Sequence, residues 1–179
     1  MNFLPGIETE TRLRYAAIRS GFPAATLVVV LHIGTEQTAV ASGSNREPDA
    51  VMVLEIGSHK TSTDYFRHTP PAPLELENAI AEIEDAVARV RPMIAENSTL
   101  FTTDTAIGEI AHISGVSAQP VLTLPLEAVE SMFERMAAIS LGRPAAQDTI
   151  PASPTFAATV LILREFMHHL NFSSITVQA

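Results

Sequence analysis

The sequence predicts a single α/β domain built on a five-stranded mixed sheet with helices on both faces. Three features support this. Short β-branched segments recur between residues 26 and 56, a long amphipathic segment spans 74–95, and an apolar, helix-length segment precedes a short strand at 173–177. Strands joined by short turns form a meander, and the alternating helices and strands that follow extend and cover such a sheet. A chain of 179 residues is long enough to bury one core.

The first part of the chain, residues 1–25, is predicted to contain a helix over 8–19. Glu8 and Glu10 lie in its first turn and Arg19 near its end, which is the charge order that the helix dipole favours. The segment SGFP at 20–23 stops the helix, because glycine and proline both interrupt helical backbone.

The second part, residues 26–56, is predicted to be a three-stranded meander over 26–33, 38–42 and 50–56. The first strand is apolar throughout rather than alternating, which indicates burial on both faces. Turn-forming residues at 34–37 and 43–49 separate the strands.

The remainder, residues 57–179, alternates helices with short strands. The helix over 74–95 carries an apolar stripe, and we expect Ile80, Ile83, Val87 and Val90 to pack on the sheet. The other expected elements are a strand at 98–103, helices at 104–113, 125–140 and 155–170, and a strand at 173–177. This element order is that of the ribonuclease H-like or actin-like ATPase fold.

Composition excludes several classes of partner. Twenty acidic residues oppose eleven basic ones, so the net charge is −9, and the chain should repel nucleic acid and anionic membranes. Cysteine is absent, no signal peptide is evident, and no apolar run is long enough to span a bilayer. We expect a soluble cytoplasmic protein that binds neither nucleic acid nor membranes.

Several segments resemble one family in the same order along the chain. LHIGTEQTA at 31–39 resembles the phosphate-binding hairpin DIGGGSTE of the exopolyphosphatase/guanosine pentaphosphate phosphohydrolase (Ppx/GppA) family. PGIETETRL at 5–13, LEIGS at 54–58, FTTDTAI at 101–107, LTLPL at 122–126 and ITV at 175–177 resemble later or flanking motifs. The resemblance covers essentially all 179 residues, but only the second of the family's two actin-like lobes.

The resemblance implies a phosphate-binding site and assigns residues to it. In such enzymes, glycine turns hold phosphate with backbone N–H groups, an Asp on the hairpin positions Mg²⁺ or water, and a Glu on the first helix acts as general base. Glu10 is the best match to that base, with Glu8 second. The corresponding phosphate-loop positions are His32, Gly34, Thr35, Glu36, Gln37, Thr38, Gly57, Thr103, Asp104 and Thr105.

This sequence departs from the family pattern at the positions that carry the chemistry. His32 replaces the hairpin Asp, while Thr35 and Glu36 replace loop glycines. We expect Glu36 and Asp104 to bring negative charge to the phosphate position, which would remove anion affinity. Structural roles compete for these residues: Glu8 and Glu10 as dipole-favouring acids, Asp104 as an N-cap. No ligand spacing supports a metal site at His32.

Three hypotheses follow. The first is a non-catalytic domain without cofactor that acts through protein contact, as a homodimer or with an unknown partner. The alternative is a Mg²⁺-dependent hydrolase of polyphosphate or guanosine polyphosphate that needs a missing lobe, and a nucleotide-binding actin-like module is the third. For the homodimer we expect an interface of exposed apolar residues around the hairpin mouth and the first helix (Leu4, Leu13, Tyr15 and Ile18), or of the free edge of the last strand.

Overall fold

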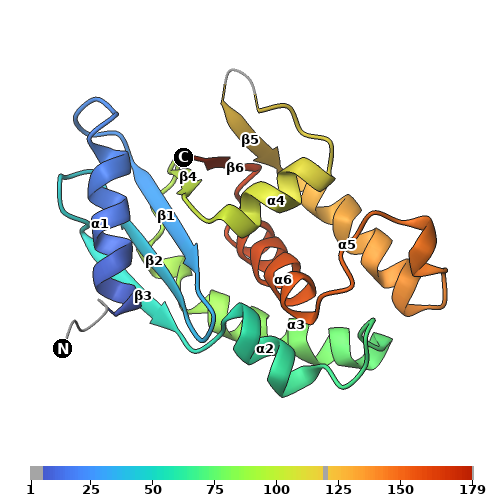
Figure 1. The fold of residues 1–179 in the computed structure, drawn as a ribbon. Coiled ribbons are helices and arrows are strands. Elements are labelled where there is room, and N and C mark those ends of the chain that lie inside the picture. Colours follow the sequence, from blue (N-terminus) through green and yellow to red (C-terminus); the bar gives the residue numbers. More distant parts are fainter. Residues whose placement is uncertain (1–5, 119–120, 179) are drawn as a thin grey trace, which may run out of the picture.

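The structure is a computed structural model that describes residues 6–118 and 121–178 (Figure 1). Its helices are α1 (Ile7–Arg19), α2 (Ser58–Tyr65), α3 (Pro73–Ala88), α4 (Thr105–Ile113), α5 (Leu126–Ser140) and α6 (Pro154–His169). Its strands are β1 (Val28–Ile33), β2 (Thr38–Gly43), β3 (Ala50–Leu54), β4 (Thr99–Thr102), β5 (Leu122–Pro125) and β6 (Ser174–Val177). Two short 3₁₀ helices, Arg91–Met93 and Ala145–Gln147, complete the described part.

The strands form one mixed sheet in the order β3-β2-β1-β4-β6-β5. The meander β1-β2-β3 is antiparallel, β1 pairs in parallel with β4 and β4 with β6, and β5 returns antiparallel to β6. The prediction of five strands was wrong by one, because β5 is only four residues long and shows little strand pattern of its own. Pairing of Leu122 with Val177 and of Leu124 with Ile175 makes it a strand.

This sixth strand also changes the edges of the sheet. β6 lies between β4 and β5, so the last strand is not a free edge, contrary to the expectation from its place near the end of the sequence. The edge strands are β3 and β5.

Helix α1 covers one face of the sheet, where it contacts β1, β2 and β3 (Figure 1). Tyr15 and Ile18 are buried there in a small core with Val28, Val30 and Phe101. The expectation that Tyr15 and Ile18 face water was therefore wrong, because the sheet itself covers them. Leu13 is 64% exposed, as expected, and Leu4 lies outside the described residues.

The opposite face carries the main core, with α6 at its centre. Helices α2, α3, α4 and α5 all contact α6 (Figure 1), which explains why its sequence is apolar nearly all round. Ile83 and Val87 of α3 and Val90 just beyond it are fully buried in the same core as Val29 and Leu31 of β1. Helix α3 ends at Ala88, earlier than predicted, and α2 was not predicted because its sequence SHKTSTDY is polar.

Among the described residues, no helix has the length and apolar character needed to cross a membrane.

Candidate functional site

The carboxyl ends of β1 and β4 bring the predicted phosphate-loop positions together. These two strands are parallel neighbours, so the residues that follow them emerge at the same end of the sheet. They form one wall of an open pocket to which α1, α2 and α4 also contribute. The pocket is lined by Arg14, His32, Ile33, Gly34, Thr35, Ser58, Thr103, Asp104, Thr105 and Ala106.

The carboxylate of Asp104 is the centre of this site. Its Oδ1 accepts a hydrogen bond from Arg14 Nη1 at 2.5 Å and lies 2.7 Å from His32 Nδ1. Its Oδ2 accepts the backbone N–H of Ile33 at 2.7 Å. The side chains of Asp104 and His32 are only 7% and 11% exposed. A carboxylate this buried needs such donors, because an uncompensated charge in the interior is costly.

This arrangement corrects the interpretation of Asp104 as a helix cap. Asp104 occupies the N-cap position of α4, but its side chain makes no capping hydrogen bond. The carboxylate points instead to β1 and α1, where a guanidinium and an imidazole stabilise it more than a helix N–H would.

Glu10, the predicted general base, belongs to the same network. Its Oε1 accepts from Arg14 Nη2 at 2.5 Å, and its Oε2 lies 3.7 Å from His32 Nε2. The side chain is 42% exposed. Glu8, the second candidate, pairs instead with Arg12 on the solvent side of α1.

The hairpin turn is joined to the start of α2 by backbone hydrogen bonds. The N–H of Ser58 donates to the carbonyl of Gly34 at 2.9 Å, and the N–H groups of His59 and Lys60 both donate to the carbonyl of Thr35. The first donors of α2, which would otherwise face an anion, are thus used within the protein. This seam requires glycine at 57, since a Cβ there would lie 2.5 Å from both the Glu36 carbonyl carbon and the Thr35 oxygen.

The other predicted positions of the hairpin point away from the pocket. Glu36 is exposed and pairs with His59, so the expectation that it places charge at the phosphate position was wrong. Gln37 donates to Glu55. Thr38 is fully buried, and its Oγ1 has no hydrogen-bond partner in the part of the chain that the structure describes. Of these two acids, only Asp104 lines the pocket.

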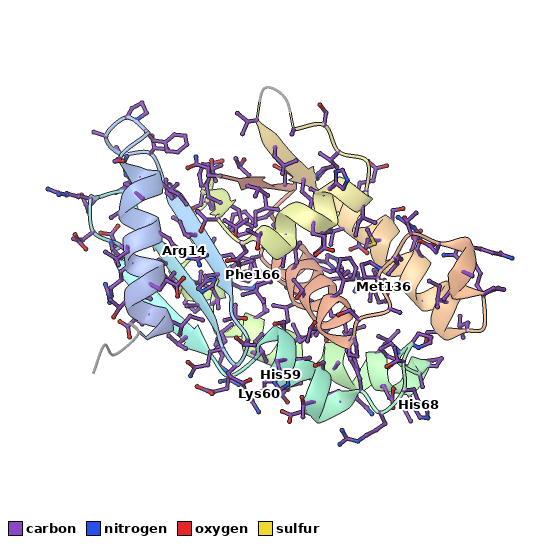
Figure 2. The ribbon with its side chains drawn as sticks, viewed as in Figure 1. Arg14, His59, Lys60, His68, Met136 and Phe166 are labelled. Atoms are coloured by element: carbon purple, nitrogen blue, oxygen red, sulfur yellow. The ribbon has the colours of Figure 1, made fainter. Side chains whose placement is uncertain are left out.

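Arg14 is the member of this cluster that sequence reasoning missed. It lies on α1 beside β1 (Figure 2) and joins Glu10 to Asp104, residues that are far apart in the sequence. Its spacing of four from Glu10 would have identified that pair on one helix face. Nothing in the local sequence identifies Asp104 as its second partner.

The carboxylates of this site do not fit Mg²⁺. Such a site needs several oxygens free to face the ion at close to octahedral geometry. Both oxygens of Asp104 and Oε1 of Glu10 already accept hydrogen bonds, and the guanidinium of Arg14 bridges the two carboxylates. Only Oε2 of Glu10 is left, and it faces His32.

Several solved structures with the same fold are exopolyphosphatases or Ppx/GppA phosphatases. The Aquifex aeolicus Ppx/GppA phosphatase has a TM-score of 0.79 at 16% identity, over 96% of this chain and 59% of that one. An exopolyphosphatase from Cytophaga hutchinsonii has a TM-score of 0.71 at 13% identity, with the same coverages. No curated protein matches the chain significantly.

These structures confirm the predicted actin-like fold, and this chain spans only about 59% of their length. The sequence profile of the Ppx/GppA phosphatase family matches residues 6–179, which is nearly the whole chain. The resemblance noted in the separate motifs therefore extends along the complete fold, and the chain belongs to the Ppx/GppA phosphatase family.

Proposed function

We propose that this Ppx/GppA-family domain is non-catalytic and acts through contact with another protein chain, in the cytoplasm. The observation that carries the proposal is the state of Asp104. Its carboxylate takes the guanidinium of Arg14, the ring of His32 and the N–H of Ile33, which are the donors that this pocket would otherwise offer to a phosphate.

Electrostatics supports the same conclusion. Two carboxylates, of Glu10 and Asp104, share the single guanidinium of Arg14, so the cluster carries no surplus positive charge when His32 is neutral. A phosphate that entered would approach a buried carboxylate of like sign, and repulsion at that range is worth several kcal/mol at low effective dielectric constant.

Hydrolysis assays test the absence of catalysis. The purified chain with Mg²⁺ is expected to release no phosphate from polyphosphate or guanosine pentaphosphate above the level of a buffer control. Turnover that disappears in Glu10→Gln would overturn the proposal, whereas Glu8→Gln, which lies on the solvent side of the same helix, serves as the control.

Anion rescue tests the role of Asp104 more directly. In Asp104→Ala, Arg14, His32 and the N–H of Ile33 lose their shared acceptor and become available to an external anion. Phosphate or sulfate is then expected to raise the Tm of Asp104→Ala clearly more than that of the wild type. Equal responses of the two proteins would show that Asp104 does not occupy the anion position.

For the protein contact we propose the edge strand β3. Its residues Ala50 to Val53 are half-buried and apolar on both faces, and one side of the strand lacks a partner within the described sheet. An edge of this kind pairs readily with a second strand, and a symmetric antiparallel pair of β3 strands would join two sheets.

Light scattering coupled to size exclusion tests this contact. We expect a dimer whose dissociation is promoted by Ala50→Lys, because an edge lysine opposes strand pairing. Leu141→Lys, at an exposed position beyond α5, should leave the mass unchanged. A monomeric mass for the wild type at high concentration would contradict the homodimer.

One observation favours the alternative function, a phosphoanhydride hydrolase completed by another lobe. Six of the predicted phosphate-loop positions do converge on one pocket. Under this alternative, a second chain that supplies the other lobe would displace the Arg14 contact from Asp104. The Glu10→Gln assay described above, repeated on such a complex, separates the two hypotheses.

A further inference from the structure

A second group of titratable side chains lies at the opposite side of the fold, at the end of α6. His168 and His169 lie three and four residues after Glu165, which places each of them beside Glu165 on the helix surface. Glu84 of the neighbouring helix α3 completes the group. The proposed function uses none of these residues.

Their donor atoms converge. His169 Nε2 lies 3.1 Å from Glu165 Oε2 and 3.3 Å from Glu84 Oε1. One ligand atom from each of Glu165, His168 and His169 lies within 4.8 Å of the others, and the two imidazole rings have their centroids 5.2 Å apart. An imidazole nitrogen between two carboxylate oxygens carries either a proton, which it donates to them, or a bound cation.

Burial fixes the central ligand. The side chain of Glu165 is 1% exposed, and its Oε1 is held by the guanidinium of Arg164, so Oε2 faces the two histidines. Arg164 is itself held by Glu130 at 2.7 Å and by the ring of Phe133. His168 is exposed and His169 half-buried, which leaves the group accessible from solvent.

We propose that Glu165, His168, His169 and Glu84 form a binding site for Zn²⁺. The two imidazoles and the Glu165 carboxylate converge, with Glu84 beside His169, and this donor set suits zinc, whereas Mg²⁺ and Ca²⁺ select oxygen ligands. The carbonyl end of α6 adds negative potential for a cation. The two neighbouring arginines do not occupy the proposed metal position. Arg164 binds the other oxygen of Glu165, and Arg91 binds the backbone carbonyl of His169.

The bound ion would link α3 to α6. Three ligands come from α6 and one from α3, and these two helices form the most extensive helix pair of the described fold. Zinc that binds only the folded chain stabilises it by mass action, so the site predicts a rise in Tm with added metal.

A hydrogen on His169 Nε2 that is donated to the two carboxylates is the competing explanation of the geometry. The two explanations differ in His168, because the proton bridge needs His169 alone while the zinc site uses both rings. His168→Ala therefore distinguishes them, and its exposed position makes misfolding of the variant easy to exclude by circular dichroism.

The experiment uses the full chain without an affinity tag, stripped of metal and titrated with Zn²⁺ by calorimetry and thermal unfolding. We expect saturable binding of one ion per chain and a higher Tm, with Mg²⁺ inactive. Co²⁺ in place of Zn²⁺ should give the visible absorption of a tetrahedral site.

The variants complete the test. His168→Ala and His169→Ala should each weaken Zn²⁺ binding by at least about tenfold, while His112→Ala, an exposed histidine on α4, should bind as the wild type does. The absence of saturable binding to the wild type would overturn the proposal. Binding that His168→Ala leaves unchanged would equally overturn it.

Discussion

Two buried carboxylates, Asp104 and Glu165, have nearly the same neighbours and different outcomes. Each is less than a tenth exposed, and each lies beside an arginine, a histidine and a second, partly exposed glutamate. Asp104 also accepts a backbone N–H, from Ile33. Within the described residues, the partners of Glu165 are the side chains of Arg164 and His169, and a second histidine, His168, lies beside it.

Residue types alone therefore do not define a ligand site. At Asp104 both oxygens are used by donors of the protein, so the cluster is complete without a ligand. At Glu165 one oxygen faces two imidazoles whose nitrogens can accept a cation. The number of donors that the fold directs at a carboxylate decides whether it stabilises the structure or binds something else.

The largest expected effect comes from removing the more fully bonded carboxylate. Asp104→Ala leaves His32 and the N–H of Ile33 buried without their acceptor, so it should lower the free energy of unfolding by about 3 kcal/mol. Glu165→Ala should cost less, by about 1 kcal/mol, because Arg164 keeps Glu130 and no backbone donor is orphaned. Urea denaturation measures both losses of stability. Equal losses would show that the additional donors to Asp104 do not make it the more important carboxylate for stability.

The next largest loss of stability is expected where the hairpin turn beside Asp104 packs against the start of α2. Gly57→Ala forces a Cβ to within 2.5 Å of backbone atoms of Thr35 and Glu36, so it should destabilise the chain by about 2 kcal/mol. Gly108→Ala, within α4, is the matched control, because the added Cβ would meet only Cγ1 of Val177, at 3.8 Å. There alanine should be neutral or stabilising. A Tm for Gly57→Ala equal to that of the wild type would exclude close packing at this turn.

A third carboxylate, Glu75, should make the stability of the chain depend on pH. Desolvation raises its pKa, but the N–H groups of Ala72 and Arg67 and the ring of His68 outweigh this and lower the pKa to about 2 from 4.5. Because the folded pKa is depressed, the stabilisation is fully present above the unfolded value and is lost as the pH falls from 4.5 towards 2.

Glu75→Gln should therefore be less stable than the wild type at neutral pH, and the difference should shrink progressively below pH 4.5. Thermal unfolding across this range measures it. A difference that stays constant with pH would show that the carboxylate charge contributes nothing.

The smallest effect is expected where the charges face solvent. The pair of Glu8 and Arg12 on α1 is about half exposed on both sides. Arg12→Ala should therefore change the free energy of unfolding by less than about 0.5 kcal/mol. A loss of stability as large as that of Asp104→Ala would mean that burial does not determine how much each carboxylate's interactions contribute to the free energy of unfolding.

Elements with a strong residue pattern could be predicted from the sequence alone. Continuous apolar residues predicted β1, the stripe through Ile83 and Val87 predicted α3, and a segment that is apolar nearly all round predicted the buried helix α6. These patterns are readable because burial repeats with the period of the local backbone. The motif order also identified the family that the profile later matched.

Features that depend on residues far apart in the sequence became visible only in the tertiary structure. Strand β5 exists because β6 supplies its hydrogen bonds, and Tyr15 is buried because the sheet covers α1. Asp104 lies 90 residues from Arg14 in the sequence, and Glu165 lies 81 from Glu84, so no local pattern relates them. The direction of a side chain towards a distant partner is set by packing, and packing is a property of the whole fold.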